Sequence, residues 1–182
     1  MEEKENVALD TVPKIFWEAV NTRKNKTAMR EKDLGIWQAI SWREYGEKSK
    51  HVGLALNSLG LNKSDVVSIA SEGIPEWIFT DLGVICVGGI SSGVYTTDSS
   101  SQVEYLVNDS KTSFYFAENE EQLDKILEVR DNCPSLKKII IYDLEGLHDF
   151  SDPQVISFSE LVKLGETIDK NHPDLFESLM SK

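Results

Sequence analysis

The chain has 182 residues, of which 40% are apolar and 27% are charged, a composition that favours a folded core over a disordered chain. Its formal net charge of −12 disfavours nucleic acid as a partner, because that binding depends on Lys and Arg neutralising phosphates. It equally disfavours an anionic membrane surface. The longest strongly apolar segment, about residues 83–90, is too short to cross a bilayer. We therefore expect a soluble domain without a transmembrane segment.

Two cysteines, Cys86 and Cys133, occur without a C-x-x-C pair, so neither a disulfide framework nor a zinc site is expected. Cys86 lies in an apolar run, where a free thiol behaves as a small buried hydrophobe. The start of the chain, Met1–Asn6, is charged where a signal peptide needs an apolar stretch. We expect a cytoplasmic location.

The first third of the chain contains helix signals and a hairpin signal. A polar leader over residues 1–11 precedes a short amphipathic helix, Val12–Val20, which Pro13 opens. Asp33-Leu34-Gly35 is a turn signal between two extended stretches, residues 27–30 and 36–40, and predicts a hairpin. Ser41 and Glu44 have the spacing of a capping box that begins a helix. We expect this helix to end at Gly60.

From residue 66 the pattern alternates between apolar strands and amphipathic helices. The predicted strands are residues 66–70, 94–96, 114–116 and 139–142, and the predicted helices are residues 77–87, 99–107 and 122–130. This alternation predicts an α/β fold with a mostly parallel sheet and helices on both faces. The expected division is a leader over 1–11, an α/β subdomain over 12–145, and loop and short helices over 146–182. In this last part we expect a loop at 144–153, a helix at 158–164 and a further helix opening at Asp174.

Phosphate-binding loops are missing from the sequence. Neither Gly-x-Gly-x-x-Gly after a strand nor Gly-x-x-x-x-Gly-Lys-Ser/Thr is present. The turn after the strand at 66–70 contains one glycine, Gly73, and the acidic Glu72, which would repel a phosphate. Gly88 and Gly89 follow a helix, where a C-cap or close packing is expected. These residues alone do not support nucleotide binding.

A run rich in hydroxyl side chains, Ser91–Ser101, includes the strand predicted at 94–96 and continues from its carboxyl end into the next predicted helix. Ligand crevices of open parallel sheets occur at the carboxyl ends of strands. The run is therefore either a turn with a helix N-cap or one wall of a binding cleft.

The other reactive side chains have ordinary structural explanations. His51, His148 and His172 are isolated, and a relay through His148 and Asp149 lacks a serine in a Gly-x-Ser-x-Gly elbow. The carboxylates near residue 120 flank a helix start, where they favour the helix dipole; they are Glu118, Glu120, Glu121 and Asp124. No catalytic, cofactor-binding or metal-binding residue is predicted.

An ordered series of segments resembles the opening of the AMP-forming adenylate-forming enzymes, and in particular the bacterial long-chain fatty acyl-CoA synthetases. The segments are Ile40–Tyr45, Leu54–Leu56, Leu59–Leu61, Asp65–Ile69, Pro75–Trp77, Gly88–Ile90, Gly93–Ser99, Gln102–Ser110 and Phe116–Leu123. The resemblance covers about residues 12–145. It implies the amino-terminal part of the synthetase large domain, and an activity that forms an acyl-adenylate and then an acyl-CoA.

The resemblance implies ATP, Mg2+, coenzyme A and a fatty acid as ligands of a full-length family member. The phosphate loop ending in Pro-Lys-Gly, the adenine and ribose motifs and the catalytic lysine of this family have no counterpart within the 182 residues. Gly73 also stands where many relatives have asparagine. No site residue is therefore transferred, and we expect an amino-terminal portion that is inactive by itself. We also expect it to self-associate through an exposed docking surface.

Two other hypotheses stay open from the sequence. The first is a stand-alone, non-catalytic interaction module with the same α/β fold. The second is an unrelated flavodoxin-like ligand-binding domain, against which the absence of a phosphate-cradling first loop already counts.

Overall fold

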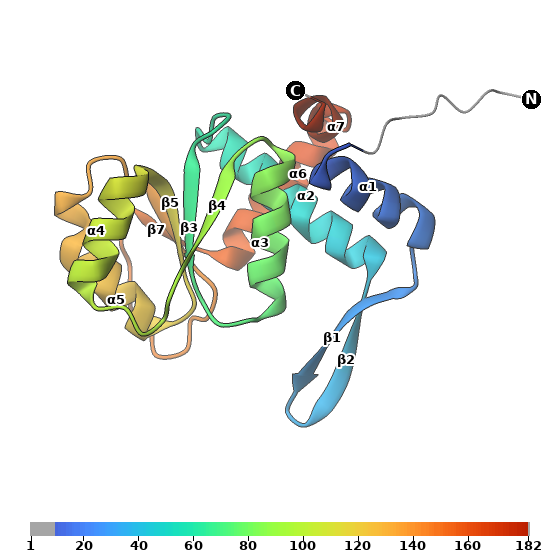
Figure 1. The fold of residues 1–182 in the computed structure, drawn as a ribbon. Helices are drawn as coiled ribbons and strands as arrows, with labels where there is room; N and C mark the ends of the chain where they lie inside the picture. Colours follow the sequence, from blue (N-terminus) through green and yellow to red (C-terminus); the bar gives the residue numbers. More distant parts are fainter. Residues whose placement is uncertain (1–9, 182) are drawn as a thin grey trace, which may run out of the picture. The chain divides into compact units, whose positions relative to one another are not determined.

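The computed structural model describes residues 10–181 (Figure 1). The chain divides into two compact units, the first ending at Gly46 and the second beginning at Glu47. The predicted polar leader falls mostly on residues 1–9, which lie outside the described residues. Between residues 10 and 181, no helix is long and apolar enough to cross a membrane. Each unit is described separately below.

The first unit consists of a helix, a hairpin and the start of a second helix. Helix α1 (Val12–Arg23) is followed by strands β1 (Thr27–Asp33) and β2 (Ile36–Ser41), which confirms the predicted helix and hairpin. The strands are antiparallel and are joined by Leu34 and Gly35, both with positive φ (44° and 83°). Two such residues are typical of a type I′ turn, whose twist matches that of the strands. Helix α1 packs against the start of the second helix, with the rings of Phe16 and Tyr45 4.7 Å apart.

The predicted capping box begins helix α2 (Trp42–Ser58). The Ser41 N–H donates to Glu44 Oε2 at 2.8 Å, and the Glu44 N–H donates back to Ser41 Oγ at 3.2 Å. The helix ends just before Gly60, whose φ of 98° suits glycine. Both predicted ends of this helix are therefore confirmed.

The second unit is built on a five-stranded parallel sheet with the order β4-β3-β5-β6-β7. Its strands are β3 (Val66–Ala70), β4 (Ile90–Val94), β5 (Thr112–Ala117), β6 (Lys138–Ile141) and β7 (Val155–Ser157). Its helices are α3 (Pro75–Cys86), α4 (Ser100–Ser110), α5 (Glu120–Val129), the short 3-10 helix η1 (Arg130–Asn132), α6 (Phe158–Asn171) and α7 (Leu175–Met180). The predicted parallel α/β sheet is confirmed.

Helices cover both faces of this sheet (Figure 1). Because side chains alternate across a strand, Tyr115 and Ile139 face α4 and α5, where they join a core that includes Val103 and Ile126. The neighbouring residues Phe114, Phe116 and Ile140, also buried, face the other way, toward α3 and α6. The second unit thus has three layers.

Two details differ from the sequence prediction. The strand predicted at residues 94–96 lies at Ile90–Val94, because β3 ends at Ala70 and pairs Ala70 with Val94. Beyond that pair the sheet offers no partner, and Tyr95 is 80% exposed. Strand β7 was not predicted, and α6 continues to Asn171 rather than ending near residue 164. The sheet therefore extends past residue 145, while the domain boundaries predicted from the sequence stay predictions.

Candidate functional site

The chain order of the strands marks one end of the sheet as the place for a ligand. From β3 the chain moves to β4 on one side and then crosses to β5 on the other. In open α/β sheets this reversal leaves a crevice at the carboxyl ends of the two strands that flank it. Here the crevice lies among residues 71–74, 95–99 and 118–119, which follow β3, β4 and β5.

Three loops are tied together across this crevice by hydrogen bonds. The Glu72 N–H donates to Glu118 Oε2 at 2.5 Å, and the Thr96 hydroxyl donates to Glu72 Oε1 at 2.6 Å. The Thr96 carbonyl accepts from Lys125 Nζ at 2.6 Å and from Gln122 Nε2 at 3.2 Å. We call these five residues the Thr96 clamp. Residue 96 is thus held by both its side chain and its backbone.

A hollow of about 450 Å³ lies beside the Thr96 clamp. Its lining residues are Glu72, Thr96, Thr97, Glu118, Asn119, Glu121, Gln122 and Lys125. The single ammonium among them, Lys125, is already bonded to the Thr96 carbonyl and lies 2.9 Å from Glu121 Oε1. Three carboxylates around one engaged cation would repel a triphosphate. The lining therefore does not fit ATP or the phosphates of coenzyme A. The sequence already indicates that Glu72 would repel a phosphate.

Some residues of the hydroxyl run, Ser91–Ser101, form the turn and helix N-cap, and others line the hollow. Ser91 belongs to β4 and donates a hydrogen bond to Asp81. Ser99 caps α4 in a complete capping box with Gln102, and Ser100 donates to Glu128 Oε2 at 2.5 Å. These serines are structural, so the turn-and-cap explanation holds for most of the run. Thr96 and Thr97 lie on the wall of the hollow.

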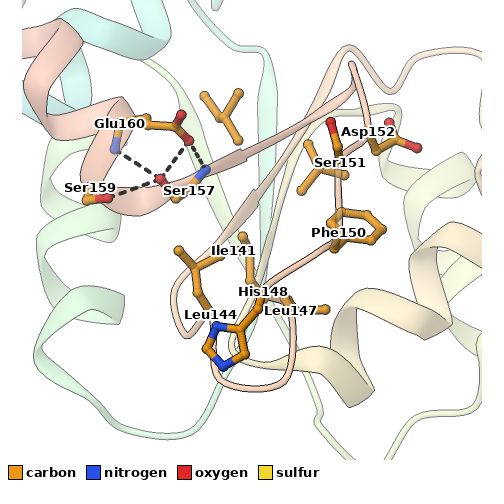
Figure 2. A pocket seen from close by; sticks show the side chains of 12 residues that line it. Ile141, Leu144, Leu147, His148, Phe150, Ser151, Asp152, Ser157, Ser159 and Glu160 are labelled. Atoms are coloured by element: carbon orange, nitrogen blue, oxygen red, sulfur yellow. Dashed lines mark hydrogen bonds between the residues drawn. The ribbon is translucent and has the colours of Figure 1, made fainter.

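A second hollow, of about 560 Å³, lies beside β7 and the loop after β6 (Figure 2). Figure 2 shows Ser157 turned toward Glu160, with the ring of His148 on the other side of the hollow. The Ser157 hydroxyl donates to Glu160 Oε2 at 2.7 Å and accepts the Glu160 N–H at 3.2 Å, as part of the capping box of α6. The hydroxyl of Ser157 and the Ser157 N–H, which donates to Glu160 Oε2 at 2.8 Å, together lower the pKa of Glu160. The arrangement is the capping box of α6.

The other two histidines have structural positions. His51 Nε2 lies 3.6 Å from Asp169 Oδ2, and Lys50 Nζ lies 2.6 Å from the same oxygen, which links α2 to α6. Burial lowers the pKa of His51, although Asp169 acts in the opposite direction. His172 ends α6, with its N–H donating to Ile168 O at 2.8 Å. Neither histidine points to catalysis.

Both cysteines are buried, and the acidic groups of the described residues form no metal-binding cluster. Cys86 and Cys133 are buried free thiols, and burial together with Asp81 raises the pKa of Cys86 to about 12. A thiol that stays protonated is a poor nucleophile. Within residues 10–181, no group of three His, Cys, Asp or Glu side chains is placed to hold a metal ion.

The family described as AMP-binding enzyme matches residues 16–174. This chain belongs to that family. Its strand order is also the one that flavodoxin-like domains use, so topology alone would not have excluded the flavodoxin-like hypothesis, but the family match does. The α/β fold expected from the resemblance is therefore confirmed together with the family.

Two relatives narrow the likeness within the AMP-binding enzymes. The chain is 30% identical to the long-chain-fatty-acid–CoA ligase ACSBG1 of Rattus norvegicus over 158 aligned residues, and this alignment covers 87% of the chain. It is 32% identical to the long-chain-fatty-acid–CoA ligase ACSBG2 of Xenopus laevis over 164 aligned residues, and this alignment covers 90% of the chain. The chain spans only 22% of the length of each relative. Both relatives are from animals, so the narrower likeness to the bacterial branch stays a prediction.

Solved structures show the same fold. The anthranilate CoA ligase AuaEII, solved in complex with anthranoyl-AMP, superposes with a TM-score of 0.72 at 23% identity, over 83% of this chain and 27% of that protein. The acetoacetyl-CoA synthetase of Streptomyces lividans superposes with a TM-score of 0.71 at 18% identity, over 82% of this chain and 24% of that protein. At these identities the likeness shows the fold alone.

Proposed function

We propose that this chain supplies the amino-terminal α/β scaffold of a long-chain-fatty-acid–CoA ligase. Its similarity to two ligases of this name over about nine-tenths of its own length is the observation that supports the proposal. In the reaction that the family resemblance implies, the fatty acid carboxylate attacks the α-phosphate of ATP and displaces pyrophosphate. The thiol of coenzyme A then displaces AMP from the acyl-adenylate. Mg2+ supplies positive charge against the phosphates in reactions of this kind.

We further propose that the 182-residue chain does not catalyse either step. Phosphoryl and acyl-adenylate chemistry depends on cations or N–H groups aimed at developing negative charge. The crevice has the opposite character, since its carboxylates outnumber its one ammonium and Lys125 is engaged by Thr96 and Glu121. On this proposal the chain's contribution is to hold the sheet and its helices in a fixed arrangement.

A chimera tests the scaffold proposal. Residues 16–174 would replace the matching segment of the rat ligase, and the formation of a fatty acyl-CoA would be measured with ATP and coenzyme A. We expect the chimera to form fatty acyl-CoA at a rate within about tenfold of the parent ligase, because a core keeps its fold when the total side-chain volume and the hydrophobic pattern are kept. In a control chimera, Gly165→Val places a side chain where the backbone carbonyl oxygen of His51 lies, so this chimera should lose coupling. A folded chimera without coupling would contradict the proposal.

The alternative is a stand-alone, non-catalytic interaction module with the same fold. The observation in its favour is the crevice itself, in which the polar groups of the Thr96 clamp are satisfied by one another. The coding sequence after codon 182 separates the two. A long continuing frame favours the ligase, and a stop codon favours the module.

Two further expectations remain proposals. We propose that the isolated chain self-associates, because large apolar side chains such as Leu34 and Trp37 are exposed. We also propose a cytoplasmic location, which cell fractionation would test.

A further inference from the structure

We infer that two copies of this chain associate edge to edge through β2, forming a four-stranded antiparallel sheet from two β1–β2 hairpins. The inference names the surface behind the proposed self-association and does not depend on the ligase assignment. The hairpin is a two-stranded sheet, so both of its outer edges lack a strand partner among the described residues. Unpaired edges are templates for pairing with another strand.

The two edges of the hairpin differ in charge. Strand β1 carries alternating charges at Arg30, Glu31, Lys32 and Asp33. In a two-fold antiparallel pair, residues that face each other lie on the same side of the sheet. A β1 pair centred on Glu31 would set Arg30 opposite Lys32 of the second copy, and a pair centred on Lys32 would set Glu31 opposite Asp33. Each of these registers sets like charges opposite one another, which is destabilising.

Strand β2 has none of the features that protect an edge. It contains no charged residue, no proline and no register shift, and these are the devices that proteins use to prevent edge pairing. Its first four residues, Ile36–Ala39, are exposed. Ile36 and Trp37 are each 65% exposed, so pairing would bury apolar surface as well as backbone.

The hairpin register determines which backbone groups of β2 point outward. Asp33 pairs with Ile36 across the two-residue turn, and Glu31 pairs with Gln38. In an antiparallel ladder such pairs alternate between hydrogen-bonded and non-hydrogen-bonded, and the pair that closes a two-residue turn is hydrogen-bonded. The N–H and C=O groups of Trp37 and Ala39 therefore point away from β1, toward a second copy.

One register of the β2–β2 pair gives hydrogen-bond partners to the outward N–H and C=O groups and sets no charged side chains opposite one another. Centred on Gln38, it pairs Trp37 with Ala39 of the second copy, so that both outward pairs exchange hydrogen bonds. It also sets Gln38 opposite Gln38 and Ile36 opposite Ile40. Two-fold symmetry closes this assembly at a dimer, since the edges left outside are the charged β1 strands.

Sedimentation velocity on the whole chain, from about 1 to 500 μM, tests the inference, because a dimer of this kind dissociates on dilution. We expect a monomer–dimer equilibrium. Gln38→Lys sets two ammonium groups opposite each other, and Ala39→Pro removes an outward N–H that edge strands can lose without breaking their own hairpin. Each should raise the dissociation constant at least about threefold, through like-charge repulsion in the first variant and a lost edge hydrogen bond in the second. Asn108→Lys adds the same charge at an exposed position of α4, outside the hairpin, and should leave the dissociation constant unchanged.

A charge-complementation experiment tests the register. In a Glu31→Gln background, which removes the carboxylate paired with position 38 inside the hairpin, Gln38→Lys and Gln38→Glu should each be monomeric. Their mixture should form a heterodimer. Circular dichroism checks that each variant keeps its fold. The inference is overturned by a wild-type chain that stays monomeric throughout, by assemblies larger than a dimer, by Gln38→Lys dimerising like the wild type, or by a mixture that does not associate.

Discussion

Gly165 of α6 lies directly against the backbone of His51 in α2, so that a Cβ at position 165 would overlap the His51 carbonyl oxygen. A second contact of the same kind joins α2 to α3, where a Cβ on Gly53 would lie 2.6 Å from the carbonyl oxygen of Gly83. The three helices thus approach one another through backbone rather than side chains. This close packing fixes the layer on one face of the sheet.

Gly165→Ala should therefore destabilise the second unit. The obstructing atoms are backbone and cannot rotate away, so α6 must shift, at a cost of about 3 kcal/mol in the free energy of unfolding. Urea denaturation measures the change. Gly93→Ala is the control, because nothing lies within 4 Å of a Cβ there, and it should change the free energy of unfolding by less than about 0.5 kcal/mol. Equal effects at both positions would contradict the packing account.

His51 should make stability depend on pH near neutrality. Burial lowers the pKa of His51 in the folded state, against the opposing effect of Asp169 and of Glu166, while Lys50 lowers it further. Below pH 6.5, the unfolded chain therefore binds more protons than the folded one, and stability falls as the pH decreases. His51→Gln removes this contribution.

The measurement is the free energy of unfolding at several pH values between 5.5 and 7.5. The variant should lose less stability than the wild type across this window. An identical slope for both proteins would show that His51 does not titrate differently on folding.

The hydrogen bond between Thr80 and Tyr142 ties α3 to the end of β6. The two hydroxyls are 2.8 Å apart and Thr80 is fully buried. Tyr142→Phe leaves the Thr80 hydroxyl without this partner, which should cost about 1–3 kcal/mol. In a double-mutant cycle, adding Thr80→Val should recover part of the loss, because the orphaned polar group is then absent. Additive costs would mean that the pair does not interact.

Lys125→Met tests the Thr96 clamp. The substitution keeps the apolar stem of the side chain and removes the ammonium that binds the Thr96 carbonyl. The amide of Asp98, which donates to the Tyr95 carbonyl at 3.0 Å, should then exchange with deuterium at least about tenfold faster, since local opening controls exchange in loops. The amide of Val107 within α4 should be unaffected. An unchanged exchange rate at Asp98 would show that Lys125 does not stabilise this loop.

Local signals predicted much of the fold because the forces behind them act within a few residues. The spacing of Ser41 and Glu44 predicts the capping box, and the turn at Leu34 and Gly35 predicts the hairpin. Strand β4 was misplaced because Ser91, Ser92 and Gly93 resemble a loop. What makes them a strand is pairing with β3, a contact that local sequence does not contain.

The candidate site was less predictable for the same reason. The hydroxyl run, which contains Thr96, predicts one wall of the crevice, and the acidic side chain of Glu72 predicts poor phosphate binding. Their hydrogen bond spans 24 residues, and the bond from Lys125 to Thr96 spans 29. Such contacts depend on the order of strands in the sheet, so no local pattern predicted Lys125.

The central claim is that these residues form a scaffold without a phosphate site of their own, and calorimetric titration of the chain with ATP and Mg2+ tests it most directly. The account predicts no saturable heat, because the crevice presents carboxylates around one engaged lysine. Saturable binding with a micromolar dissociation constant would contradict it.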